Sequence, residues 1–360
     1  MASRLEGLKA ARLLAAAALL KNRVRPPGVA DLSRLVSRAR AVLDSEDERL
    51  RPRDSRGLPG GLLDLPDLPT VLVPDLHARP GFLAAVLAWR PPLGAQAVDS
   101  YSSGGALRGA GASGPRLAEL LARGEALLLC LGDAFHSEGR GAAERWRAAL
   151  REYASGWASR RAMDLEMGKA LSCVELILRA KLALPAHFHY LKGNHDNITD
   201  EEGRGDHSFY KYAAEGEMAA SWFETTYGRA LQDAYRDLEL ALPLAARGRR
   251  FVASHAEPAF ALGPADIVEG RLRPEVVLAL TWTPNDGAAP GSVAESLKAL
   301  LGPEASEGSR WFGGHRPVAG RYALRADGRY VQFHDPDARR VVLLLPGRDP
   351  DPETCVFDLG

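Results

Sequence analysis

The sequence predicts an α/β fold in which short buried strands alternate with helices. From residue 70 onward, five apolar or β-branched runs each stop abruptly in a loop that carries His, Asp or Asn. Runs of this length, bounded by such loops, are typical of buried strands. Segments with helical spacing lie between several of them, which indicates helix layers over largely covered sheets. The five runs are residues 70–73, 126–131, 186–191, 250–253 and 310–312.

The first 66 residues are predicted to form a helical extension of a catalytic domain that covers residues 67–360. Asp31 is suited to cap a helix, and apolar residues follow it at helical spacing. Stretches rich in Pro and Gly, at 26–28 and 57–69, interrupt the segment. No residue there suggests chemistry, so we expect the extension to pack on the main domain. Binding of an unidentified partner is the alternative.

Three further segments are predicted to be helical, at 82–89, 142–182 and 223–240. The tail at 330–345 has two apolar runs on either side of Asp-Pro-Asp at 335–337. This pattern predicts a terminal β-hairpin that turns at those three residues.

Composition excludes several classes of protein. Lys plus Arg and Asp plus Glu both number 46, so no global basic field attracts nucleic acid, and nucleic-acid binding is not expected to be its function. Three scattered cysteines are too few for a disulfide framework or a thiolate zinc site. No stretch approaches the roughly 18 apolar residues that a membrane span needs. The apolar run at 13–20 lacks a cleavage site after it, so we expect a cytoplasmic protein with no membrane partner.

Six side chains at the predicted strand ends have the chemistry of metal ligands. Asp75 and His77 lie at i and i+2 of an extended loop, so their side chains face the same side. Mixed carboxylate, amide and imidazole ligands suit Mn, Fe or Zn better than Ca. The set exceeds the needs of one tetrahedral site, and a two-metal cluster with a bridging carboxylate accounts for the number. The six are Asp75, His77, Asp133, Asn194, His255 and His315.

The motifs DLH, LGD, GNHD, SHAEP and GGH, in this order, resemble those of the calcineurin-like metallophosphoesterase superfamily. The segments TTYGRALQDAYRDLELALPLAARGRRFVASHAEPA, LTWTPND and GGHRPVAGRYA are most similar to the phosphoprotein (Ser/Thr) phosphatase branch. The resemblance covers roughly residues 70–335. It implies a four-layer α/β/β/α sandwich whose two mixed sheets meet under the metals.

The resemblance also implies a role for each ligand. Asp75 and His77 would bind the first metal, Asp133 would bridge, and the remaining three would bind the second. In the other large branch of the superfamily, a second histidine follows the last motif and completes the first metal site. Here Arg316 and Pro317 follow His315, so we expect that ligand to be absent.

Catalysis is expected to use a hydroxide that bridges two divalent ions, because metal binding lowers the pKa of water towards about 7. The leaving alkoxide needs a proton, and His195 is the natural donor beside Asn194. An arginine would bind the phosphoryl group bidentately. Arg140 is the first choice because it follows the Asp133 loop, and Arg79 and Arg316 are the alternatives.

Two departures from the family pattern concern the substrate pocket. The family motif Gly-Asp-x-x-Asp-Arg-Gly has an aspartate where this chain has His136. We expect His136 to lie beside His195, so that the two imidazoles titrate as a coupled pair, with Glu138 as the compensating carboxylate. The alternative is that His136 only lines the pocket. In the first motif, Pro74 and Ala78 replace glycines, which removes no metal ligand.

These features predict a two-metal phosphatase that hydrolyses phosphomonoesters, with a phosphoprotein or a small phosphate ester as substrate. An alternative with the same fold is a hydrolase of phosphodiesters or dinucleoside polyphosphates. A non-catalytic metal-binding interaction module, with residues 1–66 as its contact surface, is the alternative from a different class.

Overall fold

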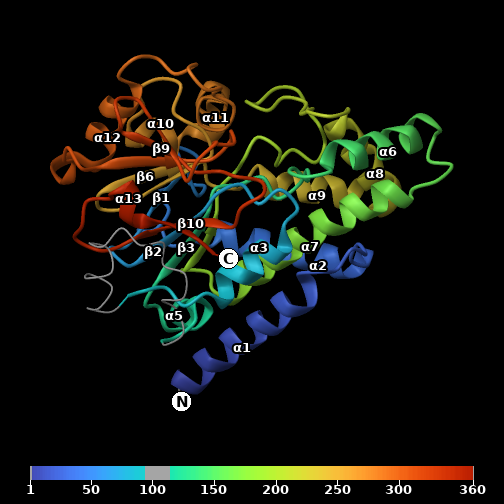
Figure 1. Ribbon diagram of the computed structural model, residues 1–360, viewed down its shortest axis with the longest axis horizontal. Helices are drawn as coiled ribbons and strands as arrows, with labels where there is room; N and C mark the ends of the chain where they lie inside the picture. The colour runs from blue at the N-terminus through green and yellow to red at the C-terminus, as the bar shows by residue number, and fades with distance from the viewer. Residues whose placement is uncertain (1, 94–113, 360) are drawn as a thin grey trace.

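The computed structural model describes residues 2–93 and 114–359, which form two mixed β-sheets packed face to face (Figure 1). The five-stranded sheet has, in spatial order, β11 (Val356–Asp358), β10 (Arg340–Leu344), β2 (Thr70–Val73), β3 (Leu127–Cys130) and β4 (Phe188–Tyr190). The six-stranded sheet has, in spatial order, β1 (Leu62–Asp64), β5 (Ala245–Arg247), β6 (Phe251–Ser254), β7 (Arg310–Gly313), β9 (Tyr330–Gln332) and β8 (Ala323–Arg325).

Three neighbouring strands run parallel in each sheet. In the five-stranded sheet these are β2, β3 and β4, and in the six-stranded sheet they are β6, β7 and β9. The carboxyl ends of parallel strands share one edge, so the loops that follow them gather on the same side of the sheet.

Alternating side chains divide the core into layers. Leu72 and Leu129 belong to a cluster that also contains Phe312 and Val331 of the other sheet, so this cluster fills the space between the sheets. Their neighbour Leu128 faces the helices instead. Successive strand side chains point to opposite faces, and both faces of each sheet are therefore covered. The expected four-layer α/β/β/α sandwich is confirmed.

Helices cover the outer face of each sheet (Figure 1). The six-stranded sheet is covered by α10 (Pro264–Val268), α11 (Pro274–Thr281) and α12 (Ser292–Leu301), with 3-10 turns at Gly270–Leu272 and Gly302–Glu304. The core over the five-stranded sheet includes α1 (Ala2–Leu20), α2 (Val29–Asp44), α3 (Pro80–Ala88), α5 (Leu117–Arg123), α6 (Ala142–Ala154), α7 (Arg161–Ala183), α8 (Glu215–Tyr227) and α9 (Arg229–Glu239). A short helix, α13 (Pro352–Cys355), precedes β11.

Two of the predicted helices are each two helices in the structure. The segment at 142–182 breaks between α6 and α7, where Gly156 and Trp157 both have positive φ. The segment at 223–240 begins earlier, in α8, and breaks at Gly228, where φ is 82°. A left-handed residue ends a helix, and the apolar periodicity on either side does not reveal it.

The predicted terminal hairpin is wrong. β9 pairs with β7 and β8, whereas β10 pairs with β2 and β11, so the two strands belong to different sheets. The residues between them, including Pro336, cross from one sheet to the other beside the edge where the site residues gather.

Packing does not separate residues 1–66 from the rest of the chain. Side chains of α1 and α2 belong to the same core as α7 and β2, and β1 pairs in parallel with β5. Buried Arg51 donates to the carbonyls of Gly60 and Ala241 (both 2.7 Å) and to Glu46 (2.8 Å). Glu46 also pairs with Lys181 of α7 (2.5 Å). The boundary at residue 66 stays a prediction.

In the part of the chain that the structure describes, no helix combines the length and the apolarity that a bilayer crossing requires.

Candidate metal centre

The six expected metal ligands lie together where the parallel strands of the two sheets end. Asp75 and His77 follow β2, Asp133 follows β3 and Asn194 follows β4. His255 and His315 follow β6 and β7 in the other sheet. Five of the six are buried, and His315 is half-buried. The convergence of polar side chains at this edge therefore agrees with the spacing of the motifs.

Three of these side chains converge on one point. The Nε2 atom of His255 lies 2.8 Å from Asn194 Oδ1 and 3.2 Å from His315 Nδ1, and His315 Nδ1 is 3.1 Å from the same amide oxygen. The Nδ1 atom of His255 is 3.0 Å from the Leu131 carbonyl, so it carries the hydrogen and Nε2 presents a lone pair. A bound cation would satisfy the lone pairs that meet here.

A second group contains a histidine that the sequence did not single out. Asp75, His77 and His334 place one ligand atom each within 4.8 Å of one another. His334 follows β9 and is fully buried. Both of its ring nitrogens and both carboxylate oxygens of Asp75 lack a hydrogen-bond partner. Buried polar atoms without partners are rare and costly, and a metal ion would satisfy one ring nitrogen of His334 together with an oxygen of Asp75.

Asp133 lies between the two groups. Its Oδ2 atom is 3.8 Å from His77 Nε2 and 3.5 Å from His255 Nε2. Its other oxygen, Oδ1, accepts the backbone N–H of His195 (2.9 Å). One carboxylate thus faces both sets of ligand atoms, which is the position that a bridging ligand needs. The donor set fits two borderline divalent ions.

Backbone geometry brings these side chains close together. A Cβ on Gly193 would collide with Asp133 Oδ1, and one on Gly314 would collide with Asp75 Oδ1, so only glycine fits at either position. His77, Asp133 and His315 themselves have positive φ, of 41°, 55° and 62°. Left-handed conformations of non-glycine residues concentrate at functional sites, where the surrounding structure holds them.

Asp196, the last residue of GNHD, holds two of the loops together. Its carboxylate accepts the Tyr190 hydroxyl (2.8 Å) and the backbone N–H groups of Gly193 (2.8 Å) and Asp133 (3.1 Å). The loops after β3 and β4 are therefore fixed by one buried carboxylate.

His136 lies beside His195, as the sequence led us to expect, with ring centroids 4.7 Å apart. Its Nδ1 atom is 3.5 Å from Glu138, and its Nε2 is 3.4 Å from Glu215, a carboxylate that the sequence did not single out. Burial opposes the imidazolium form, but these two carboxylates outweigh burial and raise the pKa of His136. Burial, with His136 and His77 nearby, lowers the pKa of His195 well below its usual value.

The ring of Phe209 stacks on His195, with centroids 4.5 Å apart and an interplanar angle of 16°. Phe209 belongs to the loop between GNHD and α8, and it fixes the plane of the imidazole. The same loop carries Lys211, whose Nζ lies 2.7 Å from Glu138. This loop therefore forms one wall of the site.

The three candidate arginines differ in their surroundings. Arg79 donates to the carbonyls of Asp75 (2.8 Å), Leu76 (3.2 Å) and three residues of the loop after His334. A guanidinium held in this way joins two site loops and has no donor pair left to bind phosphate. Arg140 and Arg316 are exposed, and the backbone N–H of Arg140 donates to Asp337 Oδ1 (3.0 Å). Phosphate binding by Arg140 stays a prediction.

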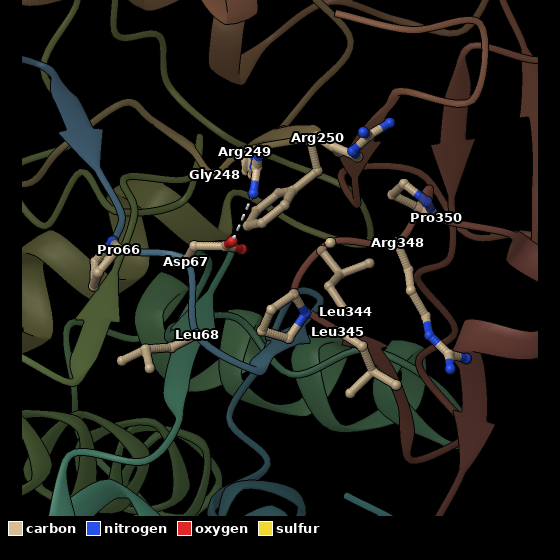
Figure 2. A pocket seen from close by; sticks show the side chains of 13 residues that line it. Pro66, Asp67, Leu68, Gly248, Arg249, Arg250, Leu344, Leu345, Arg348 and Pro350 are labelled. Carbon is tan, nitrogen blue, oxygen red and sulfur yellow. Dashed lines mark hydrogen bonds and ion pairs between the residues drawn. The ribbon is translucent and has the colours of Figure 1, made fainter. Parts of the chain in front are cut away.

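A groove at the opposite end of the strands does not contribute to this centre. Figure 2 shows it between the residues that precede β2, the turn that joins β5 to β6, and the end of β10. Its volume is only about 20 Å³. Two of its arginines are paired, Arg249 with Asp67 (3.5 Å) and Arg250 with Asp349 (2.7 Å). Arg250 Nε still lacks a hydrogen-bond partner, but the space is too small for more than a water molecule or so.

Comparison with known proteins identifies the fold. No family model matches the sequence, and no curated protein matches it either. A protein serine/threonine phosphatase from Saccharomyces cerevisiae superposes with a TM-score of 0.53 and 13% identity, over 92% of this chain and 90% of that one. A cold-active protein tyrosine phosphatase gives a TM-score of 0.42 with 12% identity, over 82% and 80% of the two chains. The first similarity shows that this chain has the fold of a phosphatase over nearly its whole length.

Proposed function

We propose that this protein is a two-metal phosphoesterase that hydrolyses phosphomonoesters. The observation that carries the proposal is the arrangement of two groups of buried ligand atoms around one carboxylate, Asp133. The fold of a known phosphatase over 92% of the chain supports the same reaction class.

Asp75, His77 and His334 would hold the first ion, and Asn194, His255 and His315 the second, with Asp133 shared. Divalent ions bound there, whether Mn, Fe or Zn, would neutralise phosphoryl charge and lower the pKa of water to near neutrality. The Nδ1 atoms of His77 and His255 support the metal role, because each bonds to a backbone carbonyl, of His136 (2.9 Å) and Leu131 (3.0 Å) respectively. Such bonds fix the tautomer and aim Nε2 at the centre.

His195 would donate a proton to the leaving oxygen. It is adjacent to Asn194, its side chain is 12% exposed, and its Nδ1 is buried without a hydrogen-bond partner. Phe209 and His136 hold the ring from two sides, which limits its rotation. A donor with a fixed position needs little reorganisation when the substrate binds.

A metal-dependence assay tests the proposal. We expect the purified chain, loaded with Mn²⁺, to hydrolyse an aryl phosphomonoester and to lose this activity on chelation. Elemental analysis should give about two ions per chain, as the paired sites require. A phosphodiester and a dinucleoside polyphosphate, tested in parallel, should react more slowly. Faster cleavage of either would assign the alternative substrate class. Metal-loaded protein with no turnover of any of the three would favour the non-catalytic metal-binding interaction module.

A further inference from the structure

A cleft of about 420 Å³ lies beside the metal centre, on the side of the α1–α2 connection. One wall consists of residues 21–24, which join the two helices. The other walls are residues 78–82, which follow His77, and residues 336–339, which come soon after His334. Its volume is in the range of small-molecule sites, roughly 300–1,000 Å³.

Positive charge dominates the lining of this cleft. Among the described residues, five cationic residues line the cleft, and Asp337 is the one acidic residue in the lining. The cations come from four separate segments, so they approach the space from several directions. They are Lys21, Arg23, Arg79, Lys169 and Arg339.

The carboxylates beside Lys169 and Arg23 do not fully cancel the charge of these two residues. Lys169 is 3.4 Å from Glu166, but Glu166 also pairs with Arg145 (2.5 Å). Arg23 pairs with Glu175, which is shared in the same way with Arg179 (2.8 Å). Glu166 and Glu175 are thus each shared with a cation that does not line the cleft, and Lys169 and Arg23 keep part of their positive charge inside it.

The amino-terminal end of α3 adds to the same field. Its first residues, Pro80 and Gly81, line the cleft. The N-terminus of a helix carries a partial positive charge and favours anions. In Figure 1, α3 lies near α7, the helix that supplies Lys169.

We infer that this cleft binds a small anion with two or more phosphoryl groups. A single phosphate would fill little of the space, whereas a diphosphate group can contact cations from more than one segment of the lining. Charge-assisted hydrogen bonds from lysine and arginine are about twice as strong as neutral ones. The inference does not depend on hydrolysis at the metal centre, because the cleft has its own lining.

Differential labelling of lysines tests the inference. The intact protein is acetylated with and without pyrophosphate, and the rate at each lysine is read by mass spectrometry. We expect pyrophosphate to slow labelling of Lys21 and Lys169 at least threefold. Lys9 and Lys298, which are exposed elsewhere, should be unaffected. Equal rates at all four lysines would overturn the inference.

Substitution provides a second measurement. The double variant Lys21→Ala, Lys169→Ala should weaken pyrophosphate binding at this cleft by about tenfold or more, since two charge-assisted contacts to the anion are lost. Lys298→Ala is the matched control and should bind as the wild type does. An unchanged dissociation constant in the double variant would rule out the cleft as the site.

Two sources of the anion can be distinguished by labelling with peptides. If a doubly phosphorylated peptide protects Lys21 and Lys169 and a singly phosphorylated one does not, the cleft receives a second phosphate of a larger molecule. Protection by pyrophosphate alone would identify a free diphosphate-bearing ligand. Protection by none of these probes would contradict the inference.

Discussion

The imidazole of His334 lies against the carboxylate of Asp75, with Nδ1 3.9 Å from Oδ2. Asp75 follows β2 of one sheet and His334 follows β9 of the other, so the contact joins the two halves of the sandwich. The motif after β7 lacks a second histidine, and His334 supplies an imidazole on the side of Asp75 and His77. In the proposed two-metal site, the first ion would therefore have a third protein ligand besides Asp133.

We predict that His334→Ala removes metal from the first site. Elemental analysis should then give about one ion per chain instead of two, and the affinity should fall by more than the roughly 10–100-fold typical of outer-shell partners. His207→Ala is the control, because His207 is exposed and its side chain contacts Glu202 (2.8 Å) and Trp282, neither of which is a proposed ligand. Full metal content in His334→Ala would show that His334 is not a ligand.

Asp133→Asn should reduce activity more than loss of any other single ligand. The carboxylate faces both groups of ligand atoms, and a neutral amide would weaken both sites at once. Asparagine keeps an oxygen that can accept the backbone N–H of His195, so the fold should be preserved. Turnover and metal content should be compared with those of Asp75→Asn. Near-native turnover in the Asp133 variant would exclude the bridging role.

Arg79→Lys should destabilise the protein by about 3 kcal/mol or more, because an ammonium cannot reach the carbonyls that the guanidinium now joins. Those carbonyls belong to the loop of Asp75 and to the loop after His334. Urea unfolding measures the change. Arg316→Lys, at an exposed position beside His315, should change the free energy of unfolding by less than about 0.5 kcal/mol. Similar values for the two variants would show that the Arg79 bonds contribute little.

The stability of the protein should fall as the pH is lowered through the range where free histidine gains a proton. His189 is buried beside Lys181, with Nδ1 3.4 Å from Nζ, while Nε2 faces the Ala186 carbonyl. Burial, followed by the Lys181 charge, lowers the pKa of His189 well below 6.5. The unfolded chain therefore binds the proton first, and the free energy of unfolding decreases with falling pH.

His189→Gln tests this pH dependence, since glutamine retains a donor and an acceptor without titrating. Between pH 6.5 and pH 5, the free energy of unfolding of the wild type should fall by up to about 2 kcal/mol more than that of the variant. His207→Gln should lose stability as the wild type does. If the free energies of unfolding of the wild type and His189→Gln change with pH in parallel, the pKa of His189 does not differ between the folded and unfolded states.

Local pattern was sufficient to locate the strands that carry the site. Each strand is a short apolar run, and the polar residues after it are spaced so that their clustering follows from parallel pairing. Side chains such as Asp75 and His255 could therefore be grouped by their positions in the sequence alone. The breaks at Gly156 and Gly228 could not be located, because the helical periodicity is the same on both sides.

His334 was missed for a different reason. The sequence around it, with apolar runs on both sides of Asp335 and Pro336, has the form of a hairpin. Which sheet a strand joins depends on partners distant in sequence, and β10 pairs with β2 rather than with β9. Glu215 was missed likewise, since its approach to His136 depends on how α8 packs.

The pairing of β2 with β10 also affects how the chain folds. Val71 of β2 lies opposite Leu343 of β10, and Val71 also lies opposite Leu128 of β3. Contacts between residues so distant in sequence form slowly, because a long loop must be closed at a cost in conformational entropy. Until β10 docks, β2 presents an apolar edge with unpaired backbone groups, which favours pairing with other chains. Conditions that delay the pairing of β10 with β2 should therefore favour aggregation, even where the folded protein is stable.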